Sequence, residues 1–365
     1  MPHLRLRPLP RKSKSTQNSS PENNNPPTTR PGIGTDGFTD KKDDDEQYDD
    51  YDDAEDIFSA FLPHLLPDDA PQFHGDPGQL LQYRSPLYGD LTVMVPQYPE
   101  KWKGTSIAGQ SKEGGGIIND VEESRKLFAH MLWSSAMVVA EKLEDAATII
   151  TSGEKLSGDD LDRASWSVQG HTVLELGAGA GLPSVISALS SASHVTITDH
   201  PSSPAFLGAI EYNIRANVPS WQRESIVSTP HEWGALDSQF ARDNKGRFSR
   251  IIAADCLWMI DQHENLARTL QWFLDSSRGR AWVVAGLHTG RAVVAHFFEM
   301  AVTLGLEIEG IYECDINNTD EDQGERRREW AAVREDEGLE NRKRWCVVAV
   351  LKRARLDVGN ADVSQ

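Results

Sequence analysis

The amino-acid sequence predicts an open α/β sheet with helices on both of its faces. From residue 171 onward, short apolar runs alternate with segments whose apolar residues recur at helical spacing. A glycine-rich turn joins the first run to the first of these helices, and two later runs end at an aspartate. Strands that alternate with helices build a mostly parallel sheet, because each helix crosses back over the sheet to the next strand.

The core elements follow one another in order from residue 171. The sequence predicts strands at 172–177, 194–199, 226–228, 251–254, 281–286, 306–312 and 344–350. Helices are expected between them, at 182–190, 203–217, 263–274 and 291–303. In the second helix Phe206, Ile210 and Ile214 recur four residues apart, which places them on one face.

The residues before the core are expected to form an N-terminal extension, 56–169, that packs on it. Apolar runs at 80–83 and 91–95 are typical of two short strands, which we interpret as a hairpin leading into the core. Apolar residues within 127–143 follow the period of a helix. The polar stretch 144–169 is interpreted as a surface insertion.

Charge and composition set the remaining boundaries. The core domain is expected to span 170–352, and the strongly charged segment 313–343 within it is interpreted as a surface insertion. Residues 1–55 are rich in Pro, Asn, Ser, Thr and Asp and change from basic to acidic, so we expect them to be disordered. Residues 353–365 are expected to be a flexible C-terminus. Deleting residues 1–50 is therefore expected to leave thermal stability nearly unchanged.

Composition excludes several classes of function. A formal net charge of −19 opposes a general affinity for nucleic acid, because a polyphosphate would be repelled. Three widely separated cysteines without C-x-x-C spacing indicate a reducing compartment and neither a disulfide framework nor a zinc site. No apolar run approaches the ~18 residues of a membrane span. We expect a monomeric cytoplasmic protein, with a nuclear location left open, that binds no nucleic acid, membrane or metal.

The N-terminus allows one alternative. A basic start with few acidic residues is also a property of transit peptides, but Pro2, Pro8 and Pro10 interrupt any amphipathic helix there. We therefore favour a disordered tail over a targeting signal.

The glycine-rich turn around residue 179 predicts a cofactor site. Glu175 precedes Gly177, Gly179 and Gly181, and Leu182 stands where the third glycine of a dinucleotide-binding G-x-G-x-x-G would fall. Glycines let the backbone approach a ligand closely, and the N–H groups of the following helix face it. A nucleotide-like cofactor other than NAD is the favoured interpretation, and a purely structural turn is the alternative.

Three further positions lie directly after predicted strands, where ligands bind in open α/β sheets. Asp199 is placed to accept hydrogen bonds from ribose hydroxyls, or alternatively to cap the next helix. Trp233 can stack on an adenine ring, or serve only as a packing anchor. Asp255 and Trp258 follow the fourth strand and are expected on the substrate side. The alternative for Asp255 is a buried aspartate satisfied by backbone N–H groups.

These motifs, taken together, resemble a known enzyme family. They are Phe-Ala-His-Met-Leu-Trp ending at Trp133, the segment 173–183, Val-Thr-Ile-Thr-Asp ending at Asp199, Asn-Ile-Arg-Ala-Asn at 213–217, Trp-Gly at 233–234 and Ala-Asp-Cys-Leu-Trp at 254–258. In this order they resemble the lysine methyltransferase family of the class I, seven-β-strand, S-adenosylmethionine-dependent methyltransferases. Within it, the chain is similar to the fungal branch labelled nicotinamide N-methyltransferase-like and to the elongation-factor methyltransferases. The resemblance covers about residues 57–352.

The resemblance implies a Rossmann-like, doubly wound, seven-stranded and mostly parallel sheet with an antiparallel last strand. It implies S-adenosyl-L-methionine as cofactor, with its methionine end near Trp133, Glu175, Gly177, Gly179 and Gly181. Its ribose would meet Asp199, its adenine Trp233, and Ala254 would lie beside it. Asp255 would stand at the substrate mouth. Trp258 replaces the Tyr or Phe that is more common in the family, which leaves the substrate open.

The reaction implied is transfer of a methyl group to an amine nitrogen. Asp255 would orient the amine, and Trp258 could stabilise a cationic nitrogen by cation–π contact. The acceptor is expected to be a protein lysine or N-terminus, with a translation factor as one possibility. A small pyridine such as nicotinamide, or a protein that binds the cofactor without catalysis, stays open as an alternative. A short-chain oxidoreductase is disfavoured because no Tyr-x-x-x-Lys pair occurs.

Overall fold

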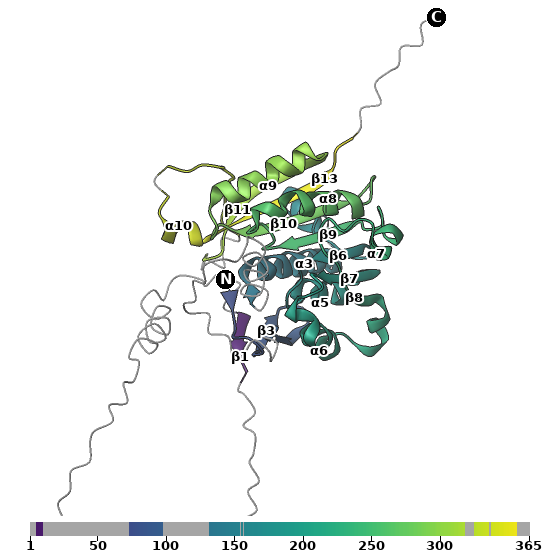
Figure 1. Ribbon diagram of the computed structural model, residues 1–365. Coiled ribbons are helices and arrows are strands. Elements are labelled where there is room, and N and C mark those ends of the chain that lie inside the picture. Colours follow the sequence, from purple (N-terminus) through teal and green to yellow (C-terminus); the bar gives the residue numbers. More distant parts are fainter. Residues whose placement is uncertain are drawn as a thin grey trace, which may run out of the picture. The chain divides into compact units, whose positions relative to one another are not determined.

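The computed structural model describes residues 5–9, 73–97, 131–317 and 325–355, except positions 154, 156 and 336 (Figure 1). All of them belong to one unit of the chain, Met1–Pro10 together with Asp68–Gln365. Several expectations lie outside the described residues. They are the acidic part of the tail, the start of the helix expected from 127, and the C-terminus beyond 355.

The centre of the fold is an eight-stranded sheet in the order β12-β11-β13-β10-β9-β6-β7-β8 (Figure 1). Its strands are β6 (Thr172–Leu176), β7 (His194–Asp199), β8 (Ile226–Pro230), β9 (Arg250–Ala254), β10 (Arg280–Gly286), β11 (Leu306–Asp315), β12 (Arg327–Glu329) and β13 (Trp345–Arg353). Strands β8, β7, β6, β9 and β10 pair in parallel, and β13 pairs antiparallel with both β10 and β11. The Rossmann-like prediction with an antiparallel last strand is therefore confirmed, and β12 adds an eighth strand at one edge.

Helices cover both faces of the sheet because its strands are apolar on both sides. Successive residues of β6 illustrate this: Val173 packs into one buried apolar cluster and Leu174 into the other. The first cluster also contains residues of α3 (Ser134–Ser152), α5 (Leu182–Leu189) and α6 (Ala209–Asn217). The second contains residues of α7 (Gln239–Asp243), α8 (His263–Phe273) and α9 (Arg291–Thr303).

The expected hairpin is confirmed, but it has a third strand that the sequence did not predict. β3 (Leu80–Ser85) pairs with β4 (Gly89–Met94), and β1 (Leu6–Pro8) pairs with the other side of β3. Arg5, next to β1, lies 3.1 Å from Glu141 and 3.1 Å from Glu144 of α3. The interpretation of the whole stretch 1–55 as a disordered tail is therefore wrong for residues 5–9, which are held by backbone pairing and ion pairs.

The helix before the core begins and ends later than predicted. Trp133 belongs to a two-residue strand, β5 (Leu132–Trp133), which pairs with β2 (Phe73–His74). α3 then runs from Ser134 to Ser152, and a short helix α4 (Gly158–Ala164) follows. The stretch 144–169 is thus no loose insertion, because buried side chains occur in both halves of it, among them Glu144 and Trp166.

Two other boundaries differ from the prediction. The helix expected over 203–217 is interrupted at Gly208, whose φ of +118° is outside the helical range, and a 3-10 turn at Pro204–Leu207 precedes α6. The charged segment expected to begin at 313 is ordered at both ends: β11 continues to Asp315, and β12 and α10 (Leu339–Lys343) lie within it.

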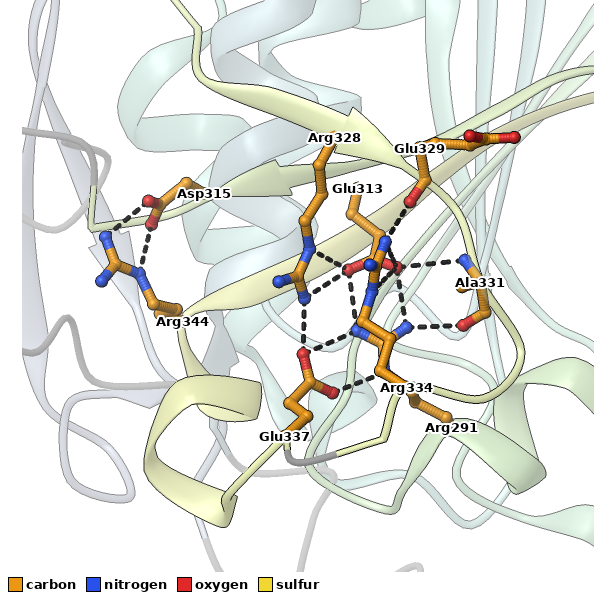
Figure 2. Close-up of polar contacts among 9 residues, drawn as sticks. All are labelled: Arg291, Glu313, Asp315, Arg328, Glu329, Ala331, Arg334, Glu337 and Arg344. Atoms are coloured by element: carbon orange, nitrogen blue, oxygen red, sulfur yellow. Dashed lines mark hydrogen bonds and ion pairs between the residues drawn. The ribbon is translucent and has the colours of Figure 1, made fainter.

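The corner formed by β11, β12 and the start of α9 is dense in charge. Glu313, which is fully buried, receives hydrogen bonds from Arg291 and Arg328 and from the weaker donor Arg334 (Figure 2). Glu337 pairs with Arg291 and Arg328 from the other side. No helix within the described ranges is long and apolar enough to cross a membrane.

Candidate active site

A cavity opens at the carboxyl edge of the sheet, where β6, β7, β8 and β9 end. Its walls come from the turn after β6, the residues after β7 and β8, the segment after β9, and the junction of β5 with α3. Parallel strands present their carboxyl ends at one edge, so residues that are far apart in the sequence meet here. Nine of the ten predicted site residues line this cavity: Trp133, Glu175, Gly177, Gly179, Asp199, Trp233, Ala254, Asp255 and Trp258.

The turn after β6 depends on glycine at three positions. Gly177, Gly179 and Gly181 all have positive φ values, of +63°, +52° and +69°, which residues with a Cβ rarely adopt. Gly177 also has no room for a side chain, because an added Cβ would lie 3.0 Å from the Sγ atom of Cys256 and 3.2 Å from the ring of Trp233. Gly181 is the N-cap residue before α5 and is not among the residues that line the cavity, so its contact with a cofactor stays a prediction.

Glu175 is a buried acid without a cationic partner among the described residues. Its side chain is 1% exposed, and its Oε2 accepts hydrogen bonds from the backbone N–H of Ser184, at 3.0 Å, and from the Ser184 hydroxyl. Burial raises the pKa of Glu175 to about 8, because these hydrogen bonds only partly offset the loss of water. A cationic group that entered the cavity beside it would favour the ionised form.

Asp199 closes the same turn from the end of β7. Its Oδ2 accepts the backbone N–H of Gly179 at 2.8 Å, and its Oδ1 accepts that of His200 at 2.7 Å. Burial raises the pKa of Asp199, although both N–H groups favour the charged form. The alternative that Asp199 caps the next helix is wrong, because Ser203 is the N-cap of the turn at Pro204–Leu207. A ribose contact stays a prediction.

Trp233 lies against the glycine turn rather than in a distant loop. Its ring is close to Gly177, and Gly234 is fixed by a hydrogen bond from its N–H to the Thr269 hydroxyl, at 2.8 Å. His231, two residues earlier, also lines the cavity and was missed. Burial lowers the pKa of His231 to about 4, so it is neutral at pH 7. Its position directly after β8 was the available signal.

Asp255 combines an unusual backbone with a carboxylate oxygen, Oδ2, that has no polar contact with the described residues. It is one of two described non-glycine residues with positive φ, at +54°, a conformation that costs of order 1–3 kcal/mol. Its described polar contacts involve Oδ1, which accepts the N–H of Gly286 at 2.9 Å and lies 4.0 Å from Nδ1 of His288. The alternative of a buried aspartate satisfied by backbone is thus correct for one oxygen, and Oδ2 is left for a ligand.

Trp133 packs between a histidine and a phenylalanine at the cavity. It ends β5 at the start of α3, and its ring stacks on that of His288, with centroids 4.9 Å apart and planes 20° apart. Phe73 of β2 meets its edge at 5.7 Å. His288 was missed, although it follows β10 as the predicted residues follow their strands.

The residues present fit S-adenosylmethionine. A cofactor with a cationic amino group suits Glu175, the buried acid without a cation, and the backbone of the glycine turn leaves space above it for a ligand. Asp199 and Trp233 line the same cavity and contact the glycine turn, so a carboxylate and an indole are available for a ribose and an adenine. The part of the chain that the structure describes contains no group of three His, Cys, Asp or Glu side chains able to hold a metal ion.

Comparisons with known proteins agree with this geometry. Residues 116–303 match the family model described as lysine methyltransferase. A relative from Gibberella zeae, named protein N-terminal and lysine N-methyltransferase EFM7, is 33% identical over 62% of this chain and 84% of its own length. One of the same name from Schizosaccharomyces pombe is 27% identical over 60% of this chain and 75% of its own length. Against two EFM7 relatives from Cryptococcus neoformans, at 29% identity, the chain spans about half of their length, 48% and 47%.

Proposed function

Because this chain belongs to the lysine methyltransferase family, we propose that it transfers a methyl group from S-adenosylmethionine to an amine nitrogen of a protein. The single observation that carries the proposal is the composition of one cavity. A glycine turn with a buried acid that has no cationic partner among the described residues forms one wall, and an aspartate whose Oδ2 has no described contact forms the other. The first wall suits the cofactor, and the second suits an amine.

On the cofactor wall, each residue has a separate task. Glu175 would receive the amino group of the methionine end, and Gly177 and Gly179 would let the backbone pass close to it. Asp199 would accept hydrogen bonds from ribose hydroxyls, and Trp233 would cover the adenine. S-adenosylmethionine supplies an already activated methyl group when bound, so the protein mainly contributes proximity and orientation.

On the substrate wall, the chain offers one acceptor and two aromatic faces. Asp255 Oδ2 would hold the amine by hydrogen bonding, because Oδ1 is occupied by Gly286. Trp258 and Trp133 line the same space and would stabilise a cationic nitrogen by cation–π contact. The relatives' names include both lysine and N-terminal amines, and both are candidate acceptors for this chain.

We further propose a translation factor as the first acceptor to test, from the resemblance to elongation-factor methyltransferases. A monomer acting in the cytoplasm is the expected form.

The test is a labelling experiment with the purified full chain. The protein is incubated with methyl-labelled S-adenosylmethionine and a fungal cell extract, beside the variant Gly179→Val, in which a branched side chain stands in the turn. Label should enter proteins with the unaltered chain only, and mass spectrometry of the labelled proteins then separates lysine from N-terminal methylation. Label confined to small molecules would overturn a protein acceptor and favour a pyridine, and no incorporation at all would favour a binding protein without catalysis.

A further inference from the structure

The loop between β10 and α9 places a histidine behind the substrate-side aspartate. His288 Nδ1 lies 4.0 Å from Asp255 Oδ1. That nitrogen is buried and has no hydrogen-bond partner among the described residues. A buried polar atom without a partner costs stability, so it needs a reason.

Gly286 lies between the two side chains and leaves them room to face each other. An added Cβ at this position would lie 3.0 Å from Nδ1 of His288 and 3.6 Å from Oδ1 of Asp255. Hydrogen bonds in active sites are often long without substrate and shorten in the complex. A movement of about 1 Å brings Nδ1 and Oδ1 to hydrogen-bond distance.

The ring of His288 contacts an indole and lies near a carboxylate. Trp133 stacks on one face of it, and an indole face attracts a cation. Of the groups in described contact with the ring, Asp255 at the end of β9 is the one that carries a charge, and it is negative. Trp133 of β5 and the backbone of Gly286 are neutral.

We propose that His288 is a positioning residue that acts through Asp255 and takes up the proton that the substrate ammonium must lose before it can be methylated. This inference rests on the proposed function. In the step, one N–H bond of the ammonium breaks, an Nδ1–H bond forms on His288, and the electron pair stays on the amine nitrogen. The carboxylate relays the proton by rotation about its soft Cβ–Cγ bond and ends unprotonated. The neutral amine is then the nucleophile, and His288 returns its proton to water after the product leaves.

The first test observes the proton rather than the turnover. The full chain, with its histidines labelled at ¹³Cε1, is mixed with S-adenosylhomocysteine and then titrated at pH 7.5 with n-butylamine, which resembles a lysine side chain. The resonance of His288 is assigned by its absence in His288→Phe, which keeps the stacked ring. It should shift when the amine binds beside Asp255 in the unaltered protein and stay in place in Asp255→Asn. A His288 resonance that ignores the amine, or that moves equally in Asp255→Asn, overturns the proposal.

The second test uses the dependence of the rate on pH. For methylation of a pooled library of lysine-containing peptides, His288→Phe should lower turnover by about 10²-fold at pH 7.5. The deficit should shrink as the pH approaches 10, because a growing share of lysine amines is then neutral without help. Added imidazole should restore part of the rate of His288→Ala. The control is His194→Phe. His194 is a partly buried histidine that starts β7 at the opposite edge of the sheet, so this variant should change neither the turnover nor its dependence on pH.

The outcomes separate this inference from the proposed function. If the unaltered chain methylates peptides but the deficit of His288→Phe is the same at all pH values and imidazole does not rescue, His288 is structural and the methyltransferase proposal stands. If the unaltered chain methylates no peptide, the proposed function fails, and the role of His288 fails with it.

Discussion

Two glutamates of the central sheet, Glu175 on β6 and Glu313 on β11, are buried to the same extent but have opposite kinds of partner. Glu175 is 1% exposed and Glu313 is 0% exposed. Burial raises the pKa of Glu175 to about 8, since one serine provides its only described hydrogen bonds. Burial also acts on Glu313, but the hydrogen bonds and charges of Arg291 and Arg328 outweigh it and hold its pKa below the usual range.

The difference shows what each carboxylate does. Glu313 is saturated: three guanidinium groups and the N–H of Ala331 reach it (Figure 2), so no acceptor position is left for a ligand. It ties β11, β12 and α9 together. Glu175 lines a cavity and has no cationic partner in the part of the chain that the structure describes. A buried acid that lacks a cation is suited to receive one from a ligand, whereas a buried acid surrounded by arginines is structural.

The largest effect is expected where the arginines lose their common partner. Glu313→Ala leaves Arg291, which is 7% exposed, with Glu337 as its one described carboxylate partner, and should reduce the free energy of unfolding by about 3–5 kcal/mol. Urea denaturation followed by circular dichroism measures the loss. The matched control is Glu329→Gln, an exposed position on β12, which should change stability by no more than about 0.5 kcal/mol. Equal losses in the two variants would contradict the structural role of Glu313.

A smaller loss is expected from a third buried acid, Glu144, which has one arginine. Burial raises its pKa, and the hydrogen bond of Tyr83 and the charge of Arg5 offset this only in part. Deleting residues 1–9 removes Arg5 and the pairing of β1 with β3, and should cost about 1–3 kcal/mol. Thermal unfolding tests it, with Arg7→Gln as a control, because Arg7 is exposed on the same strand. An unchanged melting temperature of the deletion variant would restore the sequence-based expectation of a dispensable tail.

The N-terminal strand β1 could not be predicted from the sequence. The core strands were predicted correctly because apolar runs bounded by turns are a local signal, as at 194–199. β1 has no such signal: its partner β3 lies about 75 residues away, and Arg5 reaches Glu144 across 139 positions. The burial of Glu313 was missed for the same reason, since its arginines come from three separate segments.

The sequence predicted which residues meet in the cavity, but not their individual contacts and backbone conformations. Residues that follow parallel strands meet at one edge, so Asp199 and Asp255 could be assigned to one cavity from their positions alone. The same rule applied to β10 would have found His288. The lack of a described hydrogen-bond partner for its Nδ1 and the positive φ of Asp255 could not be predicted, because both depend on how the ends of β9 and β10 pack.

The next effect concerns ligand affinity. If Glu175 must be ionised to bind the amino group of S-adenosylmethionine, binding has to expel a proton below pH 8. Affinity should then rise by about tenfold per pH unit between pH 6 and 7 and level off above pH 8. The stability of the ligand-free protein should change with pH in the opposite direction. Folded Glu175 holds its proton more tightly than it does in the unfolded chain, so its contribution to the free energy of unfolding falls as the pH rises from 4.5 to about 8.

Isothermal titration calorimetry at pH 7 in buffers of different ionisation enthalpy measures the proton released. Glu175→Gln should bind more weakly and show no dependence on buffer or pH, while Glu313→Gln should retain both. A pH-independent affinity in the unaltered protein would place the cofactor's amino group away from Glu175.

The smallest effect on stability is expected at Asp255, the acid whose backbone is strained. Asp255→Gly loses the hydrogen bond to Gly286, worth about 1 kcal/mol, but relieves a positive φ that glycine adopts freely. The two changes should nearly cancel, leaving the free energy of unfolding within about 1 kcal/mol of the unaltered protein. Asp255→Ala loses the same hydrogen bond and keeps the strain, so it should be less stable than Asp255→Gly by about 1 kcal/mol. Parallel urea titrations of the two variants measure this difference directly. An acid that the fold can lose almost without cost, at a position where its own backbone is strained, is retained for the ligand; a loss above about 3 kcal/mol in Asp255→Gly would instead place Asp255 with Glu313, among the acids that hold the fold together.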